Sequence, residues 1–210
     1  MSEASFRVGV LVSGTGTNLQ AILDRVHGRE GIEVVCVGSN KPEAYGLERA
    51  RRAGVETGVF PAADYPSRAE RDRVMGDWLE EHDVDLVVLA GFMEVLDAAF
   101  VRRFEGRLIN VHPSLLPAFP GIRAIEQALD YGVRVTGVTV HFVDEGVDTG
   151  PIILQEALAL PYAPDIAAVQ SRLHEIEHRL LPEAIRLIAR GAVRIDPTNP
   201  RRVLIDGDLN

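Results

Sequence analysis

The sequence predicts an α/β fold: a single domain built on an open, mostly parallel sheet with helices on both faces, which becomes mixed toward the C-terminal half. Two observations carry this prediction. Short runs of aliphatic and β-branched residues recur along the chain, and stretches with helical periodicity separate them. Such alternation is typical of a parallel sheet, because parallel neighbours need a crossover connection that is usually a helix. The expected architecture is therefore Rossmann-like.

The first half of the chain supplies the parallel part of this sheet. Four apolar runs are each long enough for one buried strand, at residues 8–12, 32–37, 84–90 and 108–111. Three stretches between them have helical periodicity, at residues 18–27, 43–53 and 67–82. The third is the best delimited, because Ser67 can cap it and Glu70 follows three residues later. The order predicts β-α-β-α-β-α-β, with a less distinct strand before the third helix.

The pattern changes after residue 111. Residues 134–143 and 151–158 alternate in character like an antiparallel pair. Residues 166–190 have helical periodicity, and Pro182 predicts a break or a kink in that helix. The tail from residue 196 to residue 210 predicts a short hairpin or a loose strand.

Composition indicates a soluble globular protein with an acidic surface. Lys and Arg number 22 against 31 Asp and Glu, so the formal net charge is −9. Nucleic-acid binding is not expected, because it depends on clustered basic side chains. The short basic clusters are interpreted as solvated helix faces: Arg49, Arg51 and Arg52, and Arg71 with Arg73.

Location and partners follow from the same composition. No apolar stretch approaches the roughly 18 residues of a membrane span, so no membrane partner is expected. The one cysteine, Cys36, lies in an apolar run and rules out an internal disulfide. A reducing cytoplasm is the predicted compartment, and the chain is expected to be a monomer or a weak homodimer.

The segment after the first strand is a candidate phosphate site. It reads Ser13-Gly14-Thr15-Gly16-Thr17-Asn18 and leads into a helix, whose N-terminal N–H groups favour anions. A dinucleotide fingerprint would need Gly where Leu19 stands, and a Walker loop would need Gly-Lys-Ser/Thr, so NAD and ATP are not expected. A phosphomonoester fits better, and a plain glycine turn is the alternative.

A candidate catalytic pair lies at the end of the fourth strand. Asn110 and His112 leave a buried strand at its C-terminal end, where ligands gather in open α/β sheets. Pro113 and Pro117 stiffen the segment that follows. The alternative is that His112 only caps the strand and bonds to backbone.

The acidic loop after residue 143 supplies a third candidate. Asp148 precedes Thr149-Gly150-Pro151 and is the most constrained of its three acids, whereas Asp144 and Glu145 can be turn formers. His141 is interpreted as a core residue or a supporting one. No metal is predicted, because the acids and histidines follow no ligand motif.

These segments together resemble the phosphoribosylglycinamide formyltransferase family, the folate-dependent enzymes of purine synthesis, over roughly residues 6–190. The loop at 13–20 is similar to the family's substrate-phosphate loop, and residues 89–93 to the end of its folate-pocket strand. Residues 110–117 resemble a signature shared by folate formyltransferases and hydrolases, and residues 141–151 the segment that holds the catalytic aspartate. The first loop, the chain length and the acidic charge separate the chain from relatives that formylate initiator tRNA.

The resemblance implies formyl transfer from 10-formyltetrahydrofolate to glycinamide ribonucleotide. It implies one formyltransferase domain over residues 1–210, with a phosphate-binding βα half at 6–110, a catalytic and folate-binding half at 111–190, and a tail at 191–210. The implied catalytic residues are Asn110, His112 and Asp148. The implied substrate-binding residues are Gly14, Thr15, Gly16, Thr17, Asn18 and Glu177. The implied folate-binding residues are Arg68, Met93, Glu94, Val95, Leu96, Asn110, Asp144, Glu145, Gly146, Val147 and Asp148.

In the expected chemistry Asn110 donates to the developing oxyanion, and Asp148 keeps His112 protonated so that it acts as a general acid. A water held by Asp148 is a candidate proton relay. The chain departs from the family pattern at Glu94, where Arg is frequent, at Ala118, where Lys is frequent, and at residues 123–125. Two other readings stay open: a non-catalytic module that binds a phosphorylated metabolite, and formylation of an amino sugar nucleotide.

Overall fold

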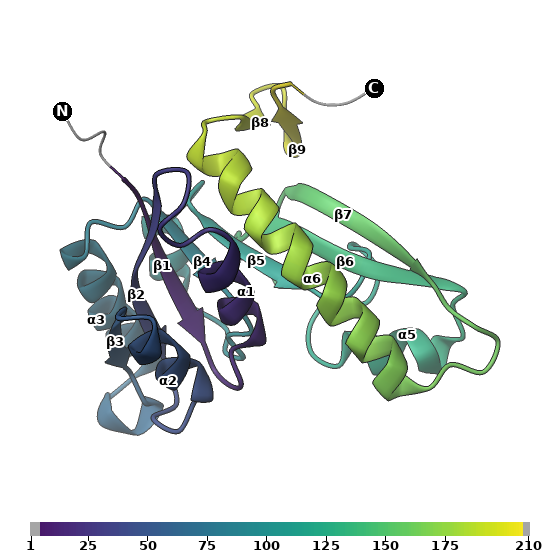
Figure 1. Cartoon of the computed structure of the whole chain (residues 1–210), viewed down its shortest axis with the longest axis horizontal. Coiled ribbons are helices and arrows are strands. Elements are labelled where there is room, and N and C mark those ends of the chain that lie inside the picture. Colours follow the sequence, from purple (N-terminus) through teal and green to yellow (C-terminus); the bar gives the residue numbers. More distant parts are fainter. Residues whose placement is uncertain (1–4, 208–210) are drawn as a thin grey trace. The chain divides into compact units, whose positions relative to one another are not determined.

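The computed structural model describes residues 5–207, and its elements follow the predicted order (Figure 1). Strands and helices alternate from β1 to β5, and an antiparallel pair, a long helix and a hairpin follow. The strands are β1 (Phe6–Val12), β2 (Ile32–Ser39), β3 (Glu56–Val59), β4 (Leu86–Leu89), β5 (Leu108–His112), β6 (Val135–Phe142), β7 (Ile152–Ala159), β8 (Val193–Asp196) and β9 (Asn199–Ile205). The helices are α1 (Thr17–Arg25), α2 (Tyr45–Arg52), the 3₁₀ turn η1 (Ala62–Asp64), α3 (Arg68–Glu81), α4 (Ala98–Arg103), α5 (Ala124–Tyr131) and α6 (Ile166–Ala189).

Within residues 5–207, seven strands form one sheet in the order β3-β2-β1-β4-β5-β6-β7, and β8 and β9 form a second, two-stranded sheet. The pairs β1–β2, β1–β4 and β2–β3 are parallel, and β6–β7 is antiparallel. The predicted fold class is therefore confirmed, including the change to a mixed sheet toward the C-terminus.

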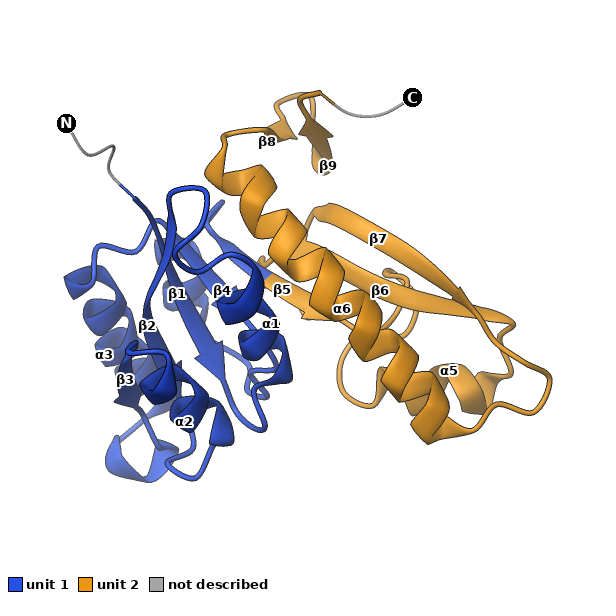
Figure 2. Ribbon diagram, viewed as in Figure 1, with its two compact units in different colours: residues 1–109 blue, residues 110–210 orange. Residues whose placement is uncertain are grey.

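The chain divides into two compact units, residues 1–109 and residues 110–210 (Figure 2). The boundary falls inside β5, one residue before the predicted division between the two halves. Each unit is described by itself below.

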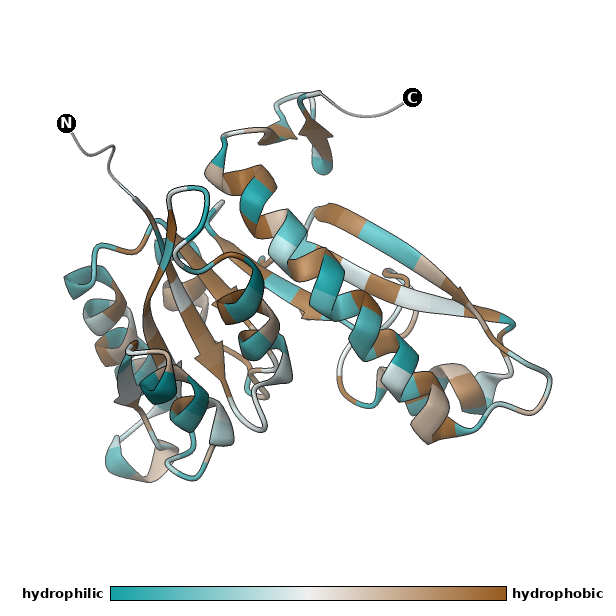
Figure 3. Ribbon diagram, in the orientation of Figure 1, coloured by the Kyte–Doolittle hydropathy of each residue, from teal (hydrophilic) through white to brown (hydrophobic). Residues whose placement is uncertain are grey.

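Unit 1 is a parallel sheet covered by helices. Strands β1 and β2 are mostly hydrophobic, and α2 and α3 contain many hydrophilic residues (Figure 3). In β1 the last five residues are all buried, as a strand covered on both faces requires. Helix α3 begins as predicted, because the Ser67 hydroxyl accepts a hydrogen bond from Glu70 N–H at 3.2 Å.

Unit 2 is built on the β6–β7 pair, and α6 packs against both strands and against α5. Of the break or kink predicted at Pro182, the break is wrong: α6 continues from Ile166 to Ala189 with Pro182 inside it. A proline removes one intrahelical hydrogen bond, but the buried face of α6 continues on both sides of it with Leu181, Ala184 and Ile185.

The tail forms the predicted hairpin, β8–β9, although it begins at Val193 rather than at residue 196. The last three residues of the predicted tail lie outside the described residues. Arg201 in β9 donates through Nη1 to the backbone carbonyl of Thr149, so the hairpin contacts the acidic loop.

Candidate active site

The loop after β1 has the shape that an anion site requires. Gly16 is the N-cap residue of α1 and has φ +70°, and a Cβ at this position would lie 2.6 Å from Gly46 Cα. Only glycine meets both conditions without strain. Gly46 N–H in turn donates to Gly14 O at 3.0 Å. The start of α2 therefore holds the loop, while Thr17 and Asn18 form the first turn of α1 with its N-terminal N–H groups.

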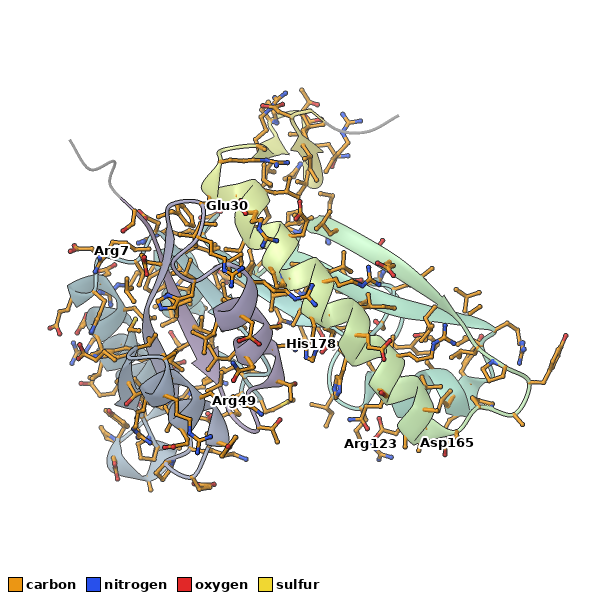
Figure 4. The ribbon with its side chains drawn as sticks, viewed as in Figure 1. Arg7, Glu30, Arg49, Arg123, Asp165 and His178 are labelled. Atoms are coloured by element: carbon orange, nitrogen blue, oxygen red, sulfur yellow. The ribbon has the colours of Figure 1, made fainter. Side chains whose placement is uncertain are left out.

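A cation lies beside this loop. Arg49 on α2 (Figure 4) donates through Nε to Thr15 O at 2.8 Å and through Nη1 to Gln20 Oε1 at 2.9 Å. The interpretation of Arg49 as part of a solvated face is therefore wrong. Arg49 and Thr15 are 34 residues apart in the sequence, so no local pattern predicts their contact.

The segment that follows β4 presents apolar side chains to solvent. Met93 is 71% exposed and Val95 is 60% exposed, whereas Leu96 is buried. Arg68, the first residue of α3, is exposed. Met93 and Val95 are thus available to an apolar ligand surface, and the Leu96 side chain faces the core.

In unit 2, β5 delivers two of the candidate catalytic side chains. Asn110 and His112 are two residues apart in the strand, so they point to the same face of the sheet. Asn110 is partly exposed and His112 is buried.

The carboxylate of Asp148 meets both of these side chains. Its Oδ2 lies 3.3 Å from His112 Nδ1 and accepts from Gly121 N–H at 2.7 Å. Its Oδ1 accepts from Asn110 Nδ2 at 3.4 Å and lies 3.6 Å from His141 Nε2. The structure therefore brings Asn110, His112 and Asp148 together.

Asp148 is held in this position by its own loop. Its φ is +52°, a left-handed conformation that costs a non-glycine residue free energy. Asp144 stabilises the loop by accepting from Gly146 N–H at 3.1 Å and from Thr149 Oγ1 at 2.5 Å. A Cβ on Gly150 would lie 1.8 Å from Phe142 O, so the loop passes too close to β6 for any side chain there.

The neighbours of the two histidines set their proton positions. His112 Nε2 lies 2.9 Å from Phe119 O, and His141 Nδ1 lies 2.7 Å from Phe142 O. Carbonyl oxygens only accept, so each of these ring nitrogens carries a hydrogen. The other nitrogen of His141, Nε2, lies 3.4 Å from Asn110 Nδ2 and 3.6 Å from Asp148 Oδ1. In His112 the other nitrogen, Nδ1, faces Asp148, so both ring nitrogens are engaged.

Burial and the Asp148 carboxylate shift the pKa of His112 in opposite directions. Burial lowers the pKa of the imidazole below its usual value and outweighs the Asp148 carboxylate and the Phe119 carbonyl, which raise it, while the nearby His141 lowers it further. Burial therefore opposes the positive charge on His112 that the Asp148 carboxylate favours.

For Asp148 the neighbouring groups, and not burial, set the direction of the pKa shift. Burial favours its neutral form, but the His141 imidazole, the Gly121 N–H and the nearby histidines together outweigh burial and lower its pKa to about 2. The centre at neutral pH therefore contains an ionised carboxylate 3.3 Å from the His112 imidazole.

The sequence did not predict several residues that support the site. Thr139 Oγ1 donates to Ser114 O at 2.7 Å and accepts from Leu116 N–H at 3.1 Å, which fixes the segment after His112. Gln155 Nε2 donates to Leu116 O at 2.9 Å. His141 was interpreted as a core or supporting residue, and an irregularity in the β6–β7 register between Val140 and His141 brings it toward Asp148. Alternating strand residues do not reveal such a shift.

Glu177 and the rest of the acidic loop complete the predicted set. Glu177 is buried on α6. Val147 is 53% exposed beside Asp148, and Glu145 and Gly146 are also at the surface. Among residues 5–207 no cluster of three His, Cys, Asp or Glu side chains is arranged to hold a metal ion. None of the helices in the described part of the chain combines the length and apolar character of a membrane span.

The fold and this centre agree with one family. Residues 6–185 match the formyl transferase family model. The chain belongs to the formyl transferase family.

Among its relatives, the phosphoribosylglycinamide formyltransferase of Haemophilus influenzae is 40% identical over 190 residues, which cover 90% of each protein. The trifunctional purine biosynthetic protein adenosine-3 of Bos taurus is 47% identical over 190 residues, and the match covers 90% of this chain but 19% of that longer protein. The crystal structure of glycinamide ribonucleotide transformylase 1 from Symbiobacterium toebii superposes with a TM-score of 0.92 at 49% identity, over 97% of this chain and 95% of that one.

Proposed function

We propose that the chain transfers the formyl group of 10-formyltetrahydrofolate to the amine of N1-(5-phospho-D-ribosyl)glycinamide. The products are the N-formyl compound and tetrahydrofolate, and the reaction belongs to de novo purine (IMP) biosynthesis. Family membership and the printed names of the relatives support the reaction. The observation that carries the proposal is the Asp148 carboxylate within 3.4 Å of both the Asn110 amide and the His112 imidazole.

The reaction sets three requirements. The neutral amine attacks the formyl carbon, the carbonyl oxygen becomes an oxyanion, and one proton leaves the attacking nitrogen while one reaches the departing N10. Asn110 meets the second requirement by donating its amide N–H, an interaction typically worth about 3 kcal/mol in the transition state. Its present contacts are long, at 3.4 Å, so they give way easily to a charged acceptor.

His112 and Asp148 take part in the proton transfer. In the resting protein His112 Nε2–H donates to Phe119 O, and a substrate oxyanion replaces that acceptor when His112 acts. In the protonated ring the second proton lies on Nδ1, where Asp148 stabilises it at 3.3 Å, and the Nε2 proton is donated to the departing N10, which leaves a neutral imidazole. A water held by Asp148 completes the transfer between the two nitrogens.

The two ligands use the remaining predicted residues. The backbone of Gly14, Thr15, Gly16, Thr17 and Asn18 holds the ribose phosphate at the start of α1, and Glu177 binds the glycinamide. Folate contacts Arg68, the segment from Met93 to Leu96, Asn110 and the loop from Asp144 to Asp148. The exposed apolar side chains of Met93, Val95 and Val147 support this assignment.

We also propose that the protein is cytoplasmic, acts as a monomer or weak homodimer, and binds neither nucleic acid nor membrane. The net charge of −9 supports the exclusion of nucleic acid.

One assay tests the reaction against its rivals. Purified protein is mixed with 10-formyltetrahydrofolate and glycinamide ribonucleotide, and the folate absorbance is followed with time. We expect turnover that depends on both compounds. Ligand binding without turnover would support the metabolite-binding module, and turnover only with an amino sugar nucleotide would support the other formyltransferase reading.

A further inference from the structure

A continuous chain of hydrogen bonds within unit 1 joins the N-terminal part of α3 to the segment after β4. Arg71 Nη1 donates to Glu94 Oε2, and Asn40 Nδ2 donates to Glu94 Oε1 at 2.5 Å. Ser13 Oγ donates to Asn40 Oδ1 at 2.6 Å and accepts from Met93 N–H at 2.8 Å. The chain therefore begins at one buried cation and ends on the backbone next to Glu94.

These groups are buried, so their partners matter. Arg71 is 1% exposed, which makes the interpretation of this residue as part of a solvated face wrong, and Ser13 and Asn40 are also buried. Arg71 Nη2 lies 2.7 Å from Asp72 Oδ1, and Asp72 Oδ2 accepts from Asp97 N–H at 2.7 Å. A buried guanidinium is tolerated only with such compensation.

The network also accounts for the departure at Glu94. An arginine placed like Glu94 would put a second cation next to the buried Arg71, and the two cations would repel each other. Glutamate instead gives Arg71 a second carboxylate, and it remains 33% exposed at the rim. Arg71 and Glu94 are thus matched to each other.

The direction of every bond in this chain follows from Arg71. A guanidinium has only donors, and a carboxylate has only acceptors, so Glu94 must receive a donor from Asn40 as well. Asn40 therefore turns its amide NH₂ toward Glu94 and its carbonyl toward Ser13. The Ser13 hydroxyl must then donate to Asn40, which leaves its oxygen to accept Met93 N–H.

We propose that Arg71 is a positioning residue that acts through Glu94 and Asn40 on both ligand-binding segments of unit 1. This inference rests on the proposed function for the identity of the ligands. The Ser13 hydroxyl hydrogen is committed to Asn40, so the phosphate is bound by the loop that follows Ser13 and not by that hydroxyl. The backbone at Met93 is held at a fixed place, with its exposed side chain presented to the folate.

The test reverses the hydrogen bond between Ser13 and residue 40 and then restores it. In Glu94→Gln the amide keeps its oxygen toward Arg71 and presents NH₂ to Asn40, so Asn40 must flip and Ser13 loses its acceptor. In the double variant Glu94→Gln with Asn40→Asp, the new carboxylate accepts from both neighbours, so the Ser13 hydroxyl again donates to residue 40 and the net charge returns, while the bond between residues 40 and 94 stays reversed. Arg73→Met is the matched control, because Arg73 lies on the same helix but is 56% exposed.

Two readouts decide the outcome. In Glu94→Gln we expect hydrogen exchange of the Met93 amide to become about tenfold faster and KM for the folate to rise about tenfold, as the loss of one buried hydrogen bond implies. The value of kcat should change less than about threefold, since no reacting group is altered. The double variant should return both readouts to within about threefold of wild type, and Arg73→Met should leave both unchanged.

A double variant that behaves like Glu94→Gln, or a Glu94→Gln protein with unchanged Met93 exchange, would overturn the proposal. An unchanged folate KM in Glu94→Gln alongside faster Met93 exchange would reduce the network to a structural role and overturn the positioning claim. Amide exchange is measured on the free protein, so it tests the network independently of the reaction. Absence of formyl transfer in the wild type would instead count against the proposed function.

Discussion

The substitution Asp148→Asn tests the centre of the site with little disturbance of its shape. Asparagine has the same outline as aspartate and tolerates the left-handed backbone that Asp148 adopts at φ +52°. Its amide oxygen still accepts from Gly121 N–H, which now donates to Asp148 at 2.7 Å. The loop should therefore keep its fold, and the variant removes mainly the negative charge.

The size of the effect follows from the distance between the charges. Opposite charges 3.3 Å apart attract by about 5 kcal/mol at an effective dielectric constant of about 20. The Asp148 side chain is 13% exposed, so solvent screens this attraction only in part. If half of it acts in the transition state, its loss raises the barrier by about 2.5 kcal/mol, which lowers kcat by close to a hundredfold.

The assay compares steady-state kinetics of wild type, Asp148→Asn and Asp130→Asn. Asp130 is an exposed residue of α5, so its substitution makes the same charge change away from the centre. We expect kcat of Asp148→Asn to fall about a hundredfold or more with both KM values within about threefold, because the lost interaction forms only as charge develops. Near wild-type turnover in Asp148→Asn would refute the role of this carboxylate.

The pH profile gives a second check on the same variant. Asp148 raises the pKa of His112 against the larger lowering effect of burial, so its removal lowers that pKa further. The acidic limb of the kcat profile should therefore move to lower pH in Asp148→Asn.

The other predictions concern stability and the phosphate loop. Because the folded state lowers the pKa of Asp148 from 3.8 to about 2, this group contributes about 2 kcal/mol of stability above pH 4, and the contribution disappears as the pH falls through about 2. Urea unfolding should therefore show a gap between wild type and Asp148→Asn that narrows toward pH 2, and a constant gap would contradict the assignment. Gly16→Ala should destabilise the protein by at least about 1 kcal/mol more than Gly28→Ala in urea unfolding, because both positions have φ near +70° but only Gly16 lacks room for a Cβ. Gly16→Ala should also raise KM for the phosphorylated substrate, and equal losses in the two variants would show that backbone strain alone matters. Arg49→Gln should raise KM for the phosphorylated substrate about tenfold without changing KM for the folate, because its charge lies beside the loop. The exposed Arg52→Gln is the control in the same kinetic assay, and a similar effect there would point to the net charge of α2 instead.

Local pattern was sufficient for the architecture. The strands β1, β2, β4 and β5 and the helices α1, α2, α3 and α6 are recognisable from the spacing of apolar residues, and Ser67 caps α3 as its sequence implies. The two short helices α4 and α5 were not predicted, because six and eight residues give too little periodicity. Their end signals, the Asp97 cap and the left-handed Gly132, were nevertheless present.

The candidate catalytic residues were recognisable for a similar reason. Asn110 and His112 lie at the end of an apolar strand where ligands gather, and Asp148 lies in the acidic, glycine-containing loop directly before Thr149-Gly150-Pro151. The assignment to a formyl transferase depended on these short motifs and on the resemblance they carry.

Only the tertiary structure determined the surroundings of these residues. It placed His141 and Gly121 N–H against Asp148, buried His112 deeply enough to lower its pKa, and buried Arg71 between two carboxylates. Charge state, burial and hydrogen-bond direction depend on atoms contributed by residues 20 to 80 positions apart. Periodicity reports the environment of a residue along its own strand or helix, and it contains no information about which distant side chain the fold brings against it.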